Sequence, residues 1–292
     1  IMLKQIMYSL GIFILVAFSA CKVNTKESMN DKLPEPPIAE KKDCVLTTHN
    51  HERIDPYFWM RLSDDQKNAK TPDAQTQEVL DYLNAENGYT DTVMYDTKEL
   101  QEKLYDEIVG RIKQDDESVP YYKNGYWYYS KYYEGQEYPI YCRKKSTLEA
   151  NEEILLNVNK LAKDYAYYSA RNLSVSPDNK LLAFGQDTVS RRIYTIRFKN
   201  LETGEWYDDQ IPGTSGNMVW ANDNKTVFYA TRDEALRSFK IFKHTLGTPV
   251  EQDEEVFHEA DETFRCFVYK SKSDQFLIIS SNSTVSDEYR VL

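Results

Sequence analysis

Glycine and paired cysteines are scarce in this sequence of 292 residues, which contains 10 Gly and four Cys. The cysteines stand singly, with no Cys-x-x-Cys pair and no His at zinc-finger spacing, so we expect no structural metal site. No Gly-rich loop precedes a helical stretch, and a nucleotide cofactor therefore has no support. We expect neither a metal nor a cofactor. The cysteines are Cys21, Cys44, Cys142 and Cys266.

Positive charge is also in deficit. Lys and Arg number 36 against 47 Asp and Glu, which gives a formal net charge of -11 at pH 7. Such a chain lacks the cationic face through which phosphate neutralisation drives nucleic-acid binding, so we expect no nucleic-acid partner. At roughly 150 residues per domain, the length suits about two domains. Tyr, by contrast, is abundant at 23 residues, and aromatic side chains favour strands.

The apolar run near the N-terminus, Ile6 to Phe18, is too short to span a membrane. A basic start, a short apolar core and small residues at the end are typical of a secretory signal peptide, whereas a spanning helix needs roughly 20 residues. Cys21 follows two small residues and resembles the lipobox cysteine of bacterial lipoproteins. We predict a signal peptide over 1–21, lipidation of Cys21, and export to the bacterial cell envelope, in the periplasm or anchored to a membrane. An ordinary signal peptide with an incidental Cys is the alternative.

Residues 22–46 are polar and contain Pro, so we predict a flexible tether there. Residues 47–117 have mostly helical apolar spacing. Thr71 and Pro72 predict the N-cap and first residue of one helix, and Asp96 predicts the start of a second. We interpret the apolar stripes of both helices as packing contacts. The stripes are Val79, Leu80 and Leu83 in the first helix, and Leu100, Leu104 and Ile108 in the second.

From Val119 onward the apolar period changes to two, and short aromatic and β-branched runs alternate with turn residues. The runs fall into three sets of four, followed by a fourth set of three. The last run of the second set, Gly204 to Ile211, and the first of the third set, Asn217 to Trp220, are expected to be separate strands. We predict a mainly β region over 118–292.

The sets repeat at a fixed interval. A polar turn at Asp178 precedes the apolar strand 181–184, and a similar turn at Asp223, 45 residues later, precedes the strand 226–229. Four strands per unit at an interval of about 45 residues are the signature of a β-propeller blade. An irregular β-sandwich is the rival, and the repeat favours the propeller. Since the last set has three strands, we expect a chain truncated within its fourth blade, the front part of a longer protein.

Residues 49–61 carry the clearest motif. They read His-Asn-His-Glu-Arg-Ile-Asp-Pro-Tyr-Phe-Trp-Met-Arg and resemble the His-Gly-x-x-Arg-x-Asp-x-Tyr-x-Trp-Leu-Arg motif of prolyl-oligopeptidase-type serine peptidases. Asn50 stands in place of Gly and Met60 in place of Leu. Further segments are similar to the oligopeptidase B (protease II) branch of that family. These segments are Val79 to Asn87, Glu107 to Lys113, Gly125 to Tyr129, Tyr138 to Arg143, Ile193 to Arg197 and His244 to Thr248.

The resemblance implies a mainly β fold, a partial β-propeller of about four blades from a larger, seven-bladed ring, preceded by a helical N-terminal segment. It also implies a C-terminal α/β-hydrolase domain on which the segment 47–117 packs, with a Ser-His-Asp triad beyond Leu292. Members of this branch cleave short peptides after Arg or Lys, and the propeller excludes folded proteins. The alternative is a secreted propeller that binds without catalysis.

No catalytic residue is expected in this chain. Ser215 lies in Gly213-Thr214-Ser215-Gly216, which lacks the Gly-x-Ser-x-Gly spacing of a nucleophile elbow and reads as a turn. His49 and His51 are two candidate metal ligands without a third, and we interpret them as exposed loop residues or as part of the N-terminal packing motif that the resemblance implies. His244 and His258 fall in or beside strands, and we expect no Ser and Asp partners near them.

Overall fold

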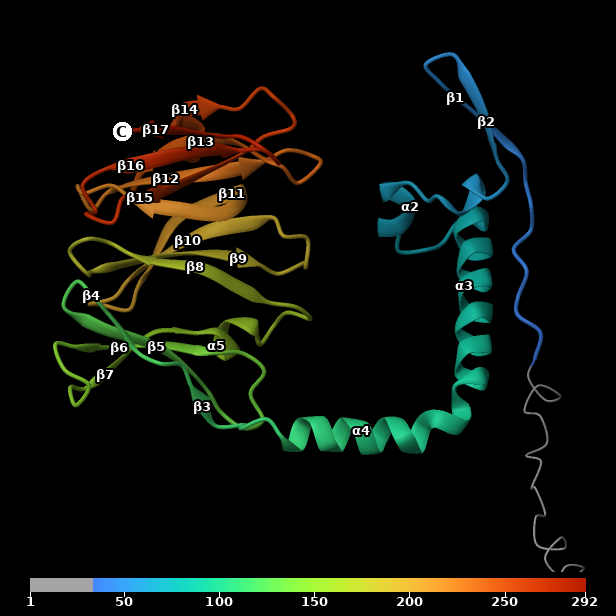
Figure 1. Ribbon diagram of the computed structural model, residues 1–292, viewed down its shortest axis with the longest axis horizontal. Coiled ribbons are helices and arrows are strands. Elements are labelled where there is room, and N and C mark those ends of the chain that lie inside the picture. The colour runs from blue at the N-terminus through green and yellow to red at the C-terminus, as the bar shows by residue number, and fades with distance from the viewer. Residues whose placement is uncertain (1–33) are drawn as a thin grey trace, which may run out of the picture. The chain divides into compact units, whose positions relative to one another are not determined.

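The computed structural model describes residues 34–292, which divide into two compact units between Ile112 and Lys113. The predicted signal peptide and Cys21 lie outside the described residues. Within 34–292, no helix combines the length and the apolar character that crossing a membrane requires. Figure 1 shows helices in the first unit and sheets in the second.

The first unit begins with a β-hairpin in the region that we expected to be mostly helical. Strands β1 (Cys44–Thr48) and β2 (His51–Asp55) pair antiparallel. His49 and Asn50 form the connecting turn with φ angles of 52° and 62°. A two-residue turn with both φ values positive matches the twist of a hairpin, and Asn tolerates that conformation well.

Helices follow the hairpin, and the longest one starts later than predicted. Helix α3 begins at Ala74, and its N-cap is Asp73, whose side chain accepts a hydrogen bond from Thr76 N. The prediction of Thr71 as N-cap is therefore wrong, because a carboxylate closer to the helix satisfies the free N–H groups. The helices of this unit are η2 (Phe58–Met60), α2 (Asp64–Asn68), α3 (Ala74–Val93), η3 (Tyr95–Thr97) and α4 (Lys98–Gly110).

The apolar stripes of α3 and α4 are only partly covered. Val79 is 5% exposed, but Leu83 is 49% exposed, and Leu100, Leu104 and Ile108 range from 46% to 59%. The α4 stripe is about half exposed in the described residues, and its interpretation as a packing face stays a prediction. The stripe is present at the predicted helical spacing.

The second unit consists of antiparallel sheets in which neighbouring strands follow one another in the chain (Figure 1). The first sheet contains β3 to β7, the second runs from β8 to β14, and the third contains β15 to β17. Its elements are β3 (Asp116–Glu117), β4 (Tyr121–Lys123), β5 (Tyr126–Tyr132), β6 (Ile140–Lys145), β7 (Glu152–Asn157), α5 (Val158–Ala162), β8 (Ser169–Val175), β9 (Leu181–Asp187), β10 (Tyr194–Asn200), β11 (Trp206–Trp220), β12 (Thr226–Arg232), β13 (Ser238–Thr245), η4 (Val250–Gln252), β14 (Glu254–His258), β15 (Arg265–Lys270), β16 (Leu277–Asn282) and β17 (Asp287–Val291).

Strand β11 corrects the prediction of two separate strands at Gly204 to Ile211 and Asn217 to Trp220. It is continuous from Trp206 to Trp220, pairing with β10 along its first part and with β12 along its second. The pairing register shifts between Thr214 and Met218. β11 is thus the last strand of the second set and the first strand of the third.

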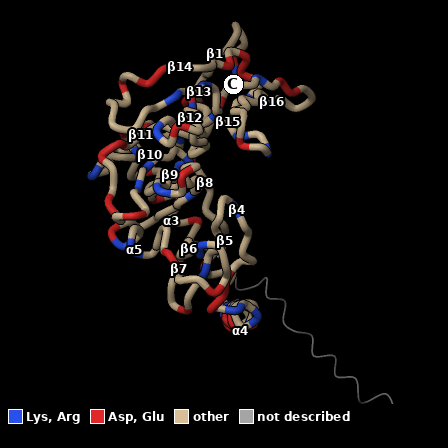
Figure 2. Tube along the Cα trace, turned by 90° about the vertical axis from the view of Figure 1, so that its left-hand side faces the viewer, with Lys and Arg blue, Asp and Glu red and all other residues tan. Residues whose placement is uncertain are grey.

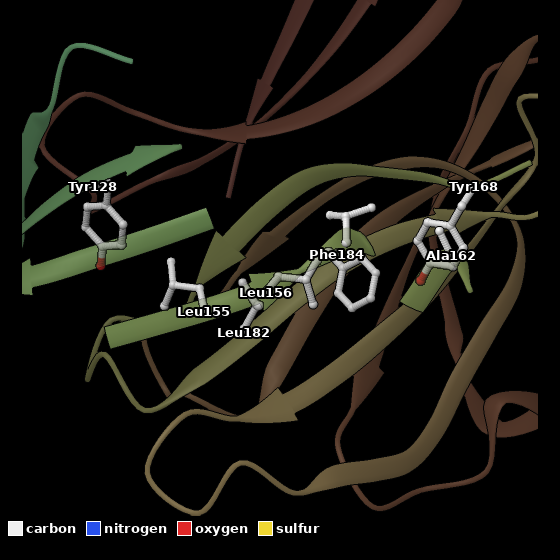
Figure 3. Packing of buried hydrophobic residues seen from close by; sticks show 8 residues of the cluster. Tyr128, Leu155, Leu156, Ala162, Tyr168, Leu182 and Phe184 are labelled. Carbon is white, nitrogen blue, oxygen red and sulfur yellow. The ribbon is translucent and has the colours of Figure 1, made fainter. Parts of the chain in front are cut away.

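Hydrophobic clusters lie between successive sets of strands. The first joins Tyr128, Leu155 and Leu156 to Leu182 and Phe184 of β9 (Figure 3). A second cluster surrounds Trp220 of β11, whose Nε1 donates to Ser174 O across 3.0 Å. The third lies between β11 to β13 and the sheet β15 to β17. The prediction of a mainly β fold preceded by a helical segment is confirmed.

Candidate functional site

The first strands of the four sets line one cavity, which we call the inner-strand cavity. Residues of β4, of β8, of the second part of β11 and of β15 surround a volume of about 1030 Å³. The turn from Ser271 to Asp274 completes its wall. Polar and charged side chains form most of this wall, together with the aromatic residues Tyr122, Trp220 and Tyr269, so the cavity is suited to a hydrated, extended guest rather than to a tightly enclosed ligand.

The charged residues of the inner-strand cavity are mainly cationic. They are three lysines, Lys123, Lys270 and Lys272, and one acid, Asp274. Lys123 Nζ lies 3.9 Å from Asp274 Oδ1, and Lys270 Nζ donates to Asn222 Oδ1 across 2.6 Å. Burial lowers the pKa of Lys270. The cavity therefore differs from the chain as a whole, on which acidic residues are more numerous and both signs are interspersed (Figure 2).

His244 has two acidic partners, contrary to the expectation that none lies near it. Its ring is fully buried, with Nδ1 2.8 Å from Asp253 Oδ1 and Nε2 3.0 Å from Asp209 Oδ1. Asp209 belongs to β11, and Asp253 is the residue after η4. The fold brings both next to β13, the strand that contains His244. Sequence spacing did not reveal the contact because Asp209 lies far from His244 along the chain.

This His-Asp arrangement does not fit catalysis by general base. Both ring nitrogens of His244 are engaged by carboxylates, so neither can take a proton from a nucleophile. Asp253 also accepts a hydrogen bond from Tyr229 OH, and Asp209 accepts one from Gly247 N. The group ties β11, β12 and β13 together in the interior of the sheet.

Ser215 lies within β11 rather than in a turn between two strands, which corrects its expected position. It is 8% exposed, and its Oγ accepts a hydrogen bond from Asn217 N. A nucleophile elbow would present the hydroxyl at an exposed strand-to-helix turn. Ser215 has neither that position nor a hydrogen bond to a His among the described residues, and its hydroxyl accepts from the nearby backbone of β11.

The motif from residue 49 to residue 61 forms the hairpin turn, β2 and η2. Trp59 is held at both ends: its Nε1 donates to Glu40 O across 2.9 Å, and its carbonyl accepts from Gln75 Nε2 of α3. His51 lines a shallow pocket with Arg53 and Arg61. In the described part of the chain, no three His, Cys, Asp or Glu side chains converge in a way that could hold a metal ion.

Three cysteines fall within the described residues, and all have free thiols. Cys142 and Cys266 are fully buried, and burial raises the pKa of each to about 12. They are therefore protonated near neutral pH and unsuited to nucleophilic chemistry. His258 is the exposed last residue of β14, with its ring edge on Phe239 at a centroid distance of 5.6 Å.

Comparisons with known proteins place these features in context. The family model described as prolyl oligopeptidase, N-terminal beta-propeller domain, matches residues 36–292. Dipeptidyl aminopeptidase BI of Pseudoxanthomonas mexicana is 45% identical over 87% of this chain, and Protease 2 of Moraxella lacunata is 32% identical over 88%. The chain spans 36% of the length of each of these relatives.

A solved structure shows the same arrangement of strands. Oligopeptidase B from Leishmania major superposes with a TM-score of 0.79 at 32% identity, and the match covers 88% of this chain and 37% of that protein. The similarity extends over nearly all of the described residues.

Proposed function

The chain belongs to the prolyl oligopeptidase family, as its N-terminal β-propeller domain, and from this premise we propose that it controls the access of peptides to a serine peptidase domain. Membership confirms the family resemblance of residues 49–61. The whole protein would hydrolyse short peptides after Arg or Lys. Its Ser-His-Asp triad would lie in an α/β-hydrolase domain, since Ser215 and His244 do not form one.

The inner-strand cavity is the observation that carries this proposal. The first strands of all four sets face it, so a peptide in the cavity would contact every part of the propeller region. A cavity bounded by strands of several sheets admits an extended chain but excludes a folded domain. Access would therefore depend on the size of the substrate.

The charge of the cavity argues that size, rather than basicity, is what this region selects. Three lysines against one aspartate give no attraction for an Arg or Lys side chain at short range. The net charge of -11 acts at longer distances and is screened by salt. We therefore assign the preference for Arg or Lys to the hydrolase domain.

The proposal also includes three partners. The exposed stripe Leu100, Leu104 and Ile108 on α4 would pack on the hydrolase domain, because an apolar helix face of this kind is usually covered in the complete protein. A lipid on Cys21 would anchor the exported protein to a membrane of the bacterial cell envelope. Short basic peptides would be its substrates.

Reversible blocking of the cavity tests the gating role in the whole enzyme. Ser273, which lines the inner-strand cavity, is changed to Cys and coupled to a bulky disulfide-forming reagent. We expect the rate of hydrolysis of an Arg-containing peptide to fall at least about fivefold and to recover when the reagent is removed by a reductant.

Ser286→Cys is the matched control, since Ser286 is an exposed turn residue of the same sheet outside the cavity. The coupled control enzyme should keep its rate. The wild-type enzyme treated with the same reagent shows whether modification of Cys44 alone changes the rate. Full activity of coupled Ser273→Cys would contradict a gating role.

A further inference from the structure

A second, narrower cavity of about 380 Å³ lies between the first sheet and β8. Four tyrosines contribute to its wall, and we call it the tyrosine cavity. Leu155, Leu173 and the buried Cys142 add apolar surface. Its volume falls within the range of pockets that hold small ligands or parts of larger ones. The four tyrosines are Tyr121, Tyr128, Tyr129 and Tyr141.

Two irregularities in neighbouring sheets border this cavity. In the first sheet, β3 and β4 both pair with β5, and Pro120 between them has no N–H to donate. Ser130 N of β5 donates a hydrogen bond to Ser118 Oγ. In β8, the register shifts between Arg171 and Ser174. Bulges and strand breaks of this kind often lie beside binding sites.

The tyrosine cavity adjoins the inner-strand cavity. Residues that line both include Lys123 and Asn124 at the end of β4, Ser174 and Val175 of β8, and Asn179. A peptide in the inner-strand cavity would therefore have the tyrosine cavity open beside it. The smaller cavity is the right size for a side chain rather than for a second peptide.

The chemistry of the wall selects an uncharged guest. Lys123 is the one charged residue among those that line the cavity, and it pairs with Asp274. No carboxylate lines the cavity, so a cationic side chain would lose its hydration without gaining a partner. Tyrosine rings, by contrast, stack favourably with another ring, as Tyr121 and Tyr128 already do at a centroid distance of 5.4 Å.

We propose that the tyrosine cavity binds one uncharged aromatic or aliphatic side chain of a peptide that occupies the inner-strand cavity. This inference rests on the proposed function in one respect, namely that the guest is a peptide. The propeller region would then hold a passing peptide by a residue other than the Arg or Lys at which it is cleaved.

Blocked amino acids test the binding directly with the full 292-residue chain. The probes are N-acetyl-phenylalanine amide and N-acetyl-leucine amide, compared with the corresponding arginine and glutamate derivatives. We expect a dissociation constant on the order of 1 mM for the phenylalanine probe, measured by saturation-transfer NMR titration. The charged probes should bind at least about tenfold more weakly. Equal binding of all four probes, or no binding of the apolar ones, would overturn the proposal.

Adjacent tyrosines of β4 provide the matched variants. Tyr121 and Tyr122 are 60% and 55% exposed, and only Tyr121 lines the tyrosine cavity, whereas Tyr122 lines the inner-strand cavity. Tyr121→Ala should weaken binding of the phenylalanine probe roughly three- to tenfold, because a ring contact is removed. Tyr122→Ala should change it less than about twofold, and Tyr121→Phe, which keeps the ring, should bind as wild type does.

The opposite result, with binding lost in Tyr122→Ala and kept in Tyr121→Ala, would place the guest outside the tyrosine cavity and overturn the proposal. Circular dichroism of each variant checks that the sheets are intact. Because the probes need no catalysis, binding can persist when the blocking experiment at Ser273 fails, and the two proposals are therefore tested separately.

Discussion

His244 is buried between two carboxylates, and its loss should be costly. Replacing it by Leu leaves Asp209 and Asp253 buried without their shared partner, at 9% and 3% side-chain exposure. We expect His244→Leu to lower the free energy of unfolding by about 3 kcal/mol, because an unpaired buried charge is strongly destabilising. Urea denaturation followed by tryptophan fluorescence measures the change.

The exposed His258 provides the control for this substitution. His258→Ala should stay within about 0.5 kcal/mol of wild type, as surface changes usually do. A small effect of His244→Leu, similar to that of His258→Ala, would show that the two carboxylates do not depend on the imidazole.

The ionisation of Glu152 in β7 makes the stability of the fold depend on pH. Burial pushes its pKa upward, but hydrogen bonds from Lys131 and Tyr129 outweigh burial and lower the pKa below its ordinary 4.5. Lys131 Nζ donates to Glu152 Oε1 and Oε2 across 2.6 and 2.8 Å. A carboxylate whose pKa is lowered by folding stabilises the fold above its unfolded pKa, and this stabilisation is lost as the pH falls through the folded value.

We therefore expect Glu152→Gln to lower the free energy of unfolding by about 1–2 kcal/mol at pH 7. Below pH 4.5 the difference from wild type should shrink toward zero, since wild-type Glu152 also becomes protonated there. Urea titrations at pH 7 and at successively lower pH measure both values. Glu149→Gln, in an exposed turn nearby, is the control, and a difference that stayed constant with pH would contradict this account.

At the scale of elements, two glycines allow β11 to pass from one set of strands to the next. Gly213 and Gly216 have φ angles of 71° and 79°. A Cβ on Gly213 would meet nothing within 4 Å, whereas a Cβ on Gly216 would lie 3.1 Å from the ring of Tyr194. Both positions require a left-handed backbone, but only Gly213 has room for a Cβ.

Alanine at each glycine separates these two effects. Gly213→Ala should cost about 1 kcal/mol, the strain of a left-handed residue. Gly216→Ala should cost about 2–3 kcal/mol, since the Tyr194 ring must also move. Equal losses in urea denaturation would show that the close approach of Tyr194 contributes nothing.

Most strands could be predicted from the sequence, but their connections could not. The period of two in runs such as 181–184 and 226–229 depends only on neighbouring side chains, and β9 and β12 formed there. The continuity of β11 depends on left-handed glycines inside a strand, which also occur in turns. A local pattern does not distinguish the two cases.

Helix starts and long-range contacts were predicted less well. Thr71-Pro72 is a good start signal, but Asp73 competes for the same role and caps α3. The His244 contacts with Asp209 and Asp253 depend on how β11 and β13 are folded together, which periodicity does not reveal. The two cavities likewise lie between strands that are far apart in the chain and do not pair with one another.

For the whole molecule, the anchor proposed at Cys21 makes a separate prediction. Cells that produce the protein and grow on a radioactive fatty acid should label the wild type but not Cys21→Ala, because the cysteine thiol is the acceptor in bacterial lipoproteins. Immunoprecipitation and autoradiography measure the label, and Cys44→Ala, which retains Cys21, is the control. Equal labelling of the wild type and Cys21→Ala would remove the anchor from the proposal.

The shared strand β11 has a mechanical consequence. Since it hydrogen-bonds to β10 and to β12, the second and third sets cannot separate without breaking backbone hydrogen bonds between paired strands. Relative motion of the sheets must instead occur at the seams between them that no strand crosses, between β7 and β8 or between β14 and β15. The tyrosine cavity lies along the first of these seams, so a side chain bound in it would sit between two sheets that no shared strand holds together.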